Sequence, residues 1–322
     1  NKDHTTKVLD YRILLMLIVV ALLALLPLFI HRFYVRLISE MLIIALFAMS
    51  VNLLLGLTGM ITFGHAAYFG AAAYTSALLV KWSGLSVNMV FIVSLIASPL
   101  VASVLGLVFG YFCVRASGLY FALLTLAFGQ LVWAVAYKWY DFTLGDTGIG
   151  KIYPPKLLMS YNGYYYFTLI VVSICIYILF RIDRSPFGWT LRAIRENPTR
   201  VEFVGIRVIR YRLIVFVLST FFSGVAGFLF AFLQRYVNPA NIGFIKSGEP
   251  ILAALVGGMY SFFGPAFGAG LMVFLDWVTN RYTEYWPLVY GSILVFFVLF
   301  FPTGVFGFLS ERGKSKANSG SN

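Results

Sequence analysis

Long apolar runs, separated by short polar connections, repeat along almost the whole chain. A helix that crosses a bilayer needs roughly 20 mostly apolar residues, and we expect such spans near 13–30, 37–56, 66–80, 88–113, 119–138, 164–180, 213–233, 249–260, 263–280 and 286–301. The eighth run is short because glycines interrupt it. The pattern predicts an all-α polytopic membrane protein of about ten transmembrane helices, some of them broken at glycines, in one domain over residues 13–305.

The longest polar interruption runs from Arg181 to Arg212 and carries eight arginines against three acids. Loops rich in arginine stay on the cytoplasmic side of a membrane. Ten spans with this loop inside also place both ends of the chain, residues 1–12 and 306–322, in the cytoplasm. A nine-span arrangement would export the basic tail, which the same bias disfavours, although Arg32 and Arg36 lie outside in the ten-span arrangement.

Composition agrees with the apolar pattern: 61% of the residues are hydrophobic and 11% are charged. The net charge of +12 is what basic residues beside membrane spans produce, so it does not indicate nucleic-acid binding. The 29 glycines suit close helix packing and broken helices. Cys113 and Cys175 fall inside predicted spans, where a cysteine packs as a small apolar residue. The first apolar run has no small-residue cleavage site after it and is expected to be a retained span.

Two short helices are expected within the basic loop. Ser185-Pro186 and Asn197-Pro198 each place a capping side chain before a proline at the first helical position, and Gly205 can end the second helix in a left-handed conformation. Leu191 and Ile194 share one face of the first helix, and Val201 and Val204 share one face of the second. We expect these faces to enter a groove on another protein; the alternative is a loop held at anionic lipid by its arginines.

The loop S-P-F-G-W-T-L-R-A-I-R-E-N, followed by a glycine, resembles the ATPase-docking loop of branched-chain amino acid ABC-importer permeases of the LivM type. The stretches 55–70 and 255–265 are similar to two further signatures of that family, and the resemblance covers about residues 40–305. It implies an importer with a second homologous permease, two ATPase subunits and an extracytoplasmic solute-binding protein. It also implies that the loop from 185 to 205 holds the coupling helices, with these residues meeting the ATPase: Ser185, Pro186, Phe187, Gly188, Leu191, Arg192, Ala193, Ile194, Arg195, Glu196, Asn197 and Gly205.

Glycine-rich stretches at 59–66 and 258–266 are similar to each other, which suggests a weak internal repeat. Paired broken helices are where transporters tend to bind their substrates. We therefore place the translocation path at these breaks and at two polar residues within spans: Asn52, Gly59, Thr62, Phe63, Gly64, His65, Gln130, Gly257, Gly258, Gly264 and Pro265. Each has a structural alternative. His65 could bond a backbone carbonyl freed by the broken helix, and Asn52 and Gln130 could bond neighbouring helices.

Chemistry within the chain itself is not expected. The segment G-D-T-G-I-G-K at 145–151 matches the glycines and lysine of a phosphate-binding loop, but Ile152 replaces the required Ser or Thr and the segment lies in a predicted outer loop. The resembled family usually has a Gly-Gly-x-Asn-Gly-like stretch there, so no role is carried over. Three scattered histidines assemble no metal site or catalytic set. The chain is expected to be a transport subunit, not an enzyme, with ATP and magnesium bound by partner ATPases.

Together these observations predict a multi-pass permease of the cytoplasmic (inner) membrane that imports leucine, isoleucine and valine by alternating access. Within the same class, a permease for urea, amides or sugars is an alternative, because the binding protein does much of the selecting. A stand-alone secondary transporter is a second alternative. It is disfavoured because ion-coupled carriers need ionisable or carbonyl-rich sites near the bilayer midplane, and the predicted spans hold few charges.

Overall fold

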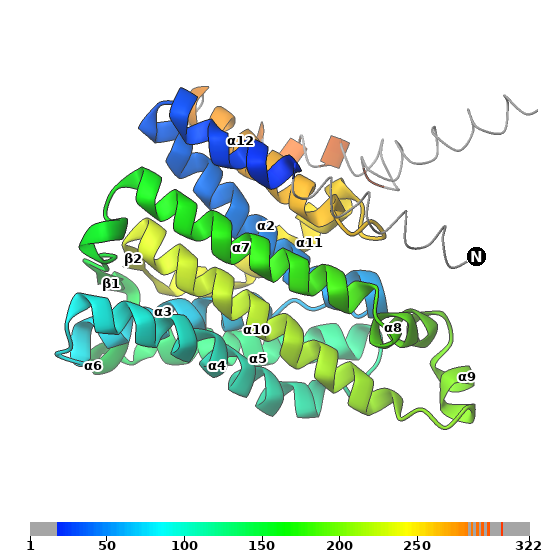
Figure 1. The fold of residues 1–322 in the computed structure, drawn as a ribbon. Coiled ribbons are helices and arrows are strands. Elements are labelled where there is room, and N and C mark those ends of the chain that lie inside the picture. Colours follow the sequence, from blue (N-terminus) through cyan, green and yellow to red (C-terminus); the bar gives the residue numbers. More distant parts are fainter. Residues whose placement is uncertain are drawn as a thin grey trace, which may run out of the picture.

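The computed structural model describes residues 18–282 and, beyond them, 285, 288, 289, 291, 292, 295, 296 and 304. The described part is a bundle of helices with one two-stranded ribbon (Figure 1). The cytoplasmic ends predicted at 1–12 and 306–322, and most of the last predicted span, lie outside the described residues.

The long helices follow the apolar runs. After a first helix at Ile18–Phe29 they are α2 (Arg32–Thr58), α3 (Ala66–Trp82), α4 (Val87–Cys113), α5 (Leu119–Lys138), α7 (Tyr161–Asp183), α10 (Val208–Gln234), α11 (Phe244–Gly257) and α12 (Gly264–Tyr282). The short elements are α6 (Tyr140–Thr143), α8 (Pro186–Glu196), α9 (Pro198–Phe203), the 3₁₀ turns η1 (Gly145–Thr147), η2 (Lys156–Leu158) and η3 (Pro239–Ile242), and strands β1 (Ile149–Gly150) and β2 (Tyr236–Val237).

Five described helices, α2, α4, α5, α7 and α10, are long and apolar enough to cross a membrane. The chain is therefore a multi-pass helical membrane protein, and the count of ten spans stays a prediction. The glycine-rich breaks account for part of the difference between the ten predicted spans and these five helices. α2 ends at Thr58, and the following Gly59 takes a left-handed conformation (φ 71°). α11 has only 14 residues before Gly258. At 1.5 Å per residue, α11 extends about 21 Å, less than a bilayer core.

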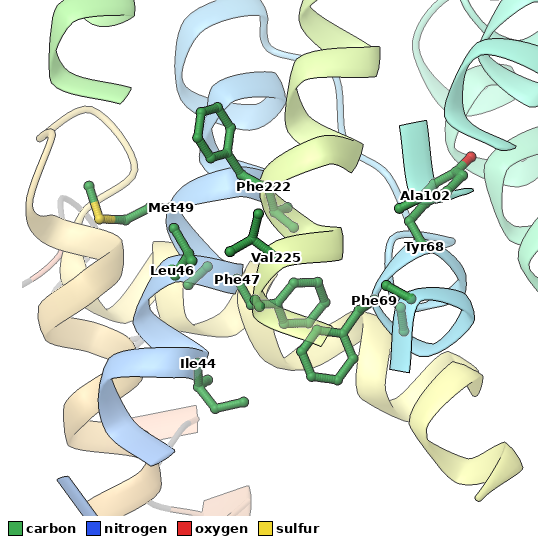
Figure 2. Packing of buried hydrophobic residues seen from close by; sticks show 14 of the residues in the cluster. Ile44, Leu46, Phe47, Met49, Tyr68, Phe69, Ala102, Phe222 and Val225 are labelled. Atoms are coloured by element: carbon green, nitrogen blue, oxygen red, sulfur yellow. The ribbon is translucent and has the colours of Figure 1, made fainter. Parts of the chain in front are cut away.

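α10 lies in the middle of the bundle and packs against α2, α3 and α4. Small residues allow these contacts. A Cβ added to Gly227 would lie 2.0 Å from the carbonyl oxygen of Phe69, and one added to Gly106 would lie 2.1 Å from Thr220 Oγ1. Aromatic rings fill the remaining space, including the pair Phe47 and Phe69, whose centroids are 4.6 Å apart (Figure 2).

The two ends of the bundle differ in structure (Figure 1). One end carries α8 and α9, which connect α7 to α10. The opposite end carries α6 and the antiparallel ribbon, in which Ile149 pairs with Val237 and Gly150 with Tyr236. The ribbon joins the connection after α5 to the connection after α10. The basic loop and the G-D-T-G-I-G-K segment therefore lie at opposite ends, as the predicted topology requires.

Candidate functional site

The local structure of the basic loop matches the sequence prediction. Ser185 caps α8 by accepting a hydrogen bond from the backbone N–H of Gly188 (3.3 Å). Asn197 caps α9 by accepting one from the N–H of Arg200 (3.0 Å). The first helix ends at Glu196, as expected from the proline two residues later. Gly205 follows α9 with a φ of 88°. The two capped helices predicted from Ser185-Pro186 and Asn197-Pro198 are thus confirmed.

The apolar face of α8 does not face outward. Leu191 is 0% exposed and Ile194 is 1% exposed, and both belong to the core of this chain. Gly188 is also buried, because a Cβ there would lie 2.5 Å from the carbonyl oxygen of Asp183 at the end of α7. The expectation that Leu191 and Ile194 enter a groove on another protein is wrong. The ends of the adjoining helices lie close enough to bury this face first.

The second helix differs from the expectation as well. Val201 is 8% exposed, but Val204 is 80% exposed, because α9 ends at Phe203 and Val204 has already left the helix. The two valines therefore do not form one face.

A different set of side chains projects from the loop. Trp189 on α8 is 61% exposed, and Phe203 at the end of α9 is 87% exposed. Ala193 and Glu196, four and seven residues after Trp189, share its exposed face. We name Trp189, Ala193, Glu196, Phe203 and Val204 the outward surface of the loop. Trp189 and Phe203 were not among the residues predicted to meet the ATPase, although helical spacing from Ala193 and Glu196 could have identified the tryptophan.

The inward side of α8 is bound to the bundle by charged groups. Arg192 donates a hydrogen bond to the carboxylate of Asp183, which is itself only 8% exposed. Arg195 donates to the backbone carbonyl of Gly56 at the end of α2, and its guanidinium lies over the ring of Tyr260. Phe187 stacks on Tyr211 of α10, with ring centroids 5.5 Å apart. Three of the residues predicted to meet an ATPase, Phe187, Arg192 and Arg195, therefore make contacts within this chain.

The predicted path residues form two groups. The first lies near the inward side of α8 and contains Asn52, Gly59, Gly257, Gly258, Gly264 and Pro265. Here the backbones meet closely, because a Cβ on Gly56 would lie 2.6 Å from the Met259 carbonyl oxygen and one on Gly257 would lie 1.8 Å from the Gly264 carbonyl oxygen. Asn52, together with Arg192 and Arg195, lines a cavity of about 130 Å³ in this region.

The second group lies between α2 and α3 and contacts α5. The Phe63 N–H donates to Thr125 Oγ1 (3.3 Å), and a Cβ on Gly64 would lie 1.9 Å from the Thr125 carbonyl oxygen. Thr62 is buried, and Phe63 contacts the ring of Phe244 at the start of α11. Gln130 is half-buried on α5, one residue after Gly129, which packs against Gly64.

His65 is fully buried and lies before α3. Its Nε2 lies 2.8 Å from Ser219 Oγ on α10, and that hydroxyl donates to the carbonyl oxygen of Ser50 on α2. Because the Ser219 hydroxyl proton is donated to the Ser50 carbonyl, we infer that Nε2 carries the imidazole proton and donates it to Ser219 Oγ. The partner of the imidazole is thus a hydroxyl, which links it to the Ser50 carbonyl. His65 joins α2, α3 and α10 through one polar contact.

Two charged residues lie near the start of α11. From the sequence, Lys246 was expected in a loop and Glu249 at the start of a span. The helix begins at Phe244, and Lys246 forms an ion pair with Glu249 (2.6 Å) on the same helix. Nearby, Gln234 of α10 donates to Glu40 of α2 (3.0 Å). These polar side chains pair with one another in the folded bundle, which the apolar pattern alone did not indicate.

The G-D-T-G-I-G-K segment helps to join two connecting loops, the one after α5 and the one after α10. Gly145 and Gly148 precede β1 instead of following a strand, and Gly150 lies within β1. Gly148, with a φ of 66°, lies against the Val237 carbonyl oxygen. Asp146 accepts a hydrogen bond from the Tyr140 hydroxyl, which raises the pKa of that tyrosine. Tyr236 donates to the Thr147 carbonyl oxygen (2.7 Å). These contacts build a folded cap at this end of the bundle.

Comparison with known proteins places these features in a family. Residues 33–301 match the family described as "Branched-chain amino acid transport system / permease component". The chain is 26% identical to the high-affinity branched-chain amino acid transport system permease protein LivM of Salmonella typhimurium, over 90% of this chain and 74% of that one. It is 28% identical to LivM of Escherichia coli, over 87% and 71%, and 23% identical to the permease protein LivH of that organism, over 82% and 91%. No solved structure matches the chain.

Proposed function

Because the chain belongs to the family of branched-chain amino acid transport system permease components, we propose that it is the membrane subunit of an ATP-driven importer for leucine, isoleucine and valine. The family match over residues 33–301 carries this proposal. The relatives named above are permease proteins of branched-chain amino acid transport systems. The chain is a transport subunit and not an enzyme, so hydrolysis belongs to its partners.

The proposed assembly contains this permease, a second homologous permease, two ATPase subunits that bind ATP and magnesium, and an extracytoplasmic solute-binding protein. The capped helices α8 and α9 form a compact projection at one end of the bundle, which supports a docking role for them (Figure 1). Within it, the outward surface of Trp189, Ala193, Glu196, Phe203 and Val204 offers exposed apolar area to a soluble partner. We propose that the ATPase contacts this surface.

The proposed mechanism is alternating access. The binding protein delivers an amino acid to the end of the bundle that carries the ribbon. Closure of the ATPases then moves α8 and α9, and the bundle changes which side its path faces. The zwitterionic substrate would be held partly by backbone amides and carbonyls at the breaks near 59–65 and 257–264. The path residues named above stay proposals for this role.

Location and topology follow from the same proposal. The importer would lie in the cytoplasmic membrane, with ten spans, the domain over 13–305, and both ends of the chain in the cytoplasm. The arginine-rich loop favours this orientation, because such loops are retained inside.

Uptake into membrane vesicles tests the function. Vesicles containing this permease, its sister permease, the ATPases and the binding protein should accumulate labelled leucine only when ATP is supplied to the ATPase side. Labelled urea, short amides and sugars should not accumulate. ATP-driven uptake of urea without leucine would assign the chain to the alternative substrate class. Gradient-driven uptake by the chain alone would identify a secondary transporter and contradict the proposal.

A further inference from the structure

We propose that Arg195 is a positioning residue that transmits movement of α8 to both glycine-rich breaks of the bundle. The inference rests on the proposed function, in which an ATPase moves α8 and α9. It concerns the side of α8 that faces this chain's own helices, opposite the outward surface. Its consequence is that Arg195 sets how much transport accompanies each ATP hydrolysed, while other residues attach the ATPase.

The first contact of Arg195 is with the end of α2. Its Nη1 donates to the carbonyl oxygen of Gly56. The last carbonyls of a helix have no partner within the helix, and the next backbone N–H groups, of Gly59 and Met60, bond to Leu55 and Leu54 instead. A guanidinium at this position makes a charge-assisted hydrogen bond and complements the negative end of the helix dipole. The arginine therefore serves as the cap of α2 from 139 residues away.

The second contact is with the turn that follows α11. The Cζ atom of Arg195 lies 5.0 Å from the centroid of the Tyr260 ring, within the range of a cation–π interaction. Tyr260 lies between α11, which ends at Gly257, and α12, which begins at Gly264. One side chain thus contacts both breaks: the end of α2 before the first, and the turn inside the second.

Glycines make this convergence sterically feasible. A Cβ on Gly59 would lie 3.2 Å from Arg195 Cγ, at a φ of 71° that side chains rarely adopt, and a Cβ on Gly56 would press on the Met259 carbonyl oxygen. The backbone after α2, the backbone after α11 and the arginine are therefore in direct contact. A displacement of α8 must therefore shift these two segments as well, because closely packed groups transmit movement and change between discrete arrangements.

The cavity beside Arg195 supplies a second position for its guanidinium. The cavity has a volume of about 130 Å³, enough for a side-chain group to move into. Asn52 lines it, and its buried Oδ1 accepts no hydrogen bond from any described residue. Arginine has five N–H donors. We infer that movement of α8 transfers the guanidinium from the Gly56 carbonyl to Asn52, giving the joint the two arrangements that transmission requires.

The test uses the whole importer reconstituted in proteoliposomes, with leucine uptake and ATP hydrolysis measured together. Arg195→Gln removes the guanidinium, and Tyr260→Ala removes only the ring beneath it. Tyr260→Phe is the matched control, because phenylalanine keeps the aromatic face. Arg200→Gln is a charge control, since Arg200 is an exposed arginine of α9. Co-purification of the ATPases is recorded for every variant.

We expect Arg195→Gln and Tyr260→Ala to retain the ATPases and hydrolyse ATP, while leucine uptake per ATP falls about tenfold, the size of a typical coupling effect. Tyr260→Phe and Arg200→Gln should keep the wild-type ratio. An unchanged ratio in Tyr260→Ala, or an equal loss in Tyr260→Phe, overturns the inference and leaves the proposed function intact. If Arg195→Gln does not fold, the two Tyr260 variants decide. Failure of the wild-type chain to retain ATPases overturns the proposed function, and the inference with it.

Discussion

Arg192 and Asp183 form an ion pair that joins α8 to the last residue of α7. The carboxylate is mostly covered, with 11% of its side chain exposed, and its second oxygen lies 3.7 Å from Arg184 Nε. The guanidinium of Arg192 also lies over Trp189, with its Cζ atom 5.0 Å from the ring centroid. The same arginine thus fixes the angle of α8 on its own bundle and supports a residue of the outward surface.

Replacing this carboxylate should loosen the loop. Asp183→Asn removes the charge that two arginines share, and we expect the free energy of unfolding to fall by about 2 kcal/mol, as for a charged hydrogen bond in a covered site. Thermal unfolding in detergent measures the change. Glu196→Gln is the control, because Glu196 is an exposed carboxylate at the end of α8. Equal stability of the two variants would show that the pair does not hold α8.

Trp189 should be an attachment point for the ATPase. Exposed tryptophans at the centre of an interface often carry a large share of its binding energy. We expect Trp189→Ala to weaken ATPase retention by at least about tenfold, which corresponds to about 1.4 kcal/mol, with little change in thermal stability. Pull-down of the ATPase from solubilised membranes measures this. Retention equal to wild type would remove Trp189 from the docking surface.

Leu191 should behave in the opposite way. Leu191 is fully buried in this chain, so Leu191→Asp places an unpaired charge in an apolar site. The primary effect of this substitution should therefore be a loss of thermal stability, not a loss of docking. Its folding is followed by yield of monodisperse protein after size-exclusion chromatography. A stable Leu191→Asp protein that lacks ATPase would instead support the original interpretation of this residue as a direct contact.

Gly64 should tolerate no side chain. A Cβ there would lie 1.9 Å from the Thr125 carbonyl oxygen, whereas a Cβ on Gly248 would meet no atom of the described residues within 4 Å. We expect Gly64→Ala to lower the free energy of unfolding by about 1–3 kcal/mol, the usual range for overpacking, and Gly248→Ala to be close to neutral. Thermal unfolding of the pair compares them directly. Similar values for both would mean that α5 does not contact the break after α2 this closely.

The contact between His65 and Ser219 gives a fifth prediction. Ser219→Ala leaves His65 Nε2 and the Ser50 carbonyl without their shared hydroxyl in a buried site, so stability should fall by about 1–3 kcal/mol. Ser103→Ala is the control, because among the described residues the Ser103 hydroxyl bonds only to a carbonyl of its own helix, that of Pro99. A loss no greater than that of the control would show that the three-helix contact is dispensable.

Local signals were sufficient for the helix ends. Ser185-Pro186 and Asn197-Pro198 placed α8 and α9, because a cap depends on neighbouring residues alone. What covers a helix face depends on residues far away in the sequence. Leu191 and Ile194 were correctly assigned to one face, but only the fold shows that the bundle itself buries them.

Polar contacts between residues far apart in the sequence could not be predicted for the same reason, because they depend on how the helices pack. Arg195 is 139 residues from Gly56, and His65 is 154 residues from Ser219. The start of α11 was also misplaced, because Lys246 and Glu249 interrupt the apolar pattern. Their mutual pairing, with Lys246 lying over the rings of Phe69 and Phe230, lets the helix begin at Phe244.

In the function we propose, the loop of α8 and α9 faces the cytoplasm, where an ATPase can act on it. The most direct measurement is labelling of a single exposed cysteine, Phe203→Cys, with a membrane-impermeant maleimide, after replacing the buried Cys113 and Cys175 by alanine. We predict labelling in inside-out vesicles and none in right-side-out vesicles, with protection when the ATPase is added. Labelling in intact right-side-out vesicles would place the loop outside and contradict the account.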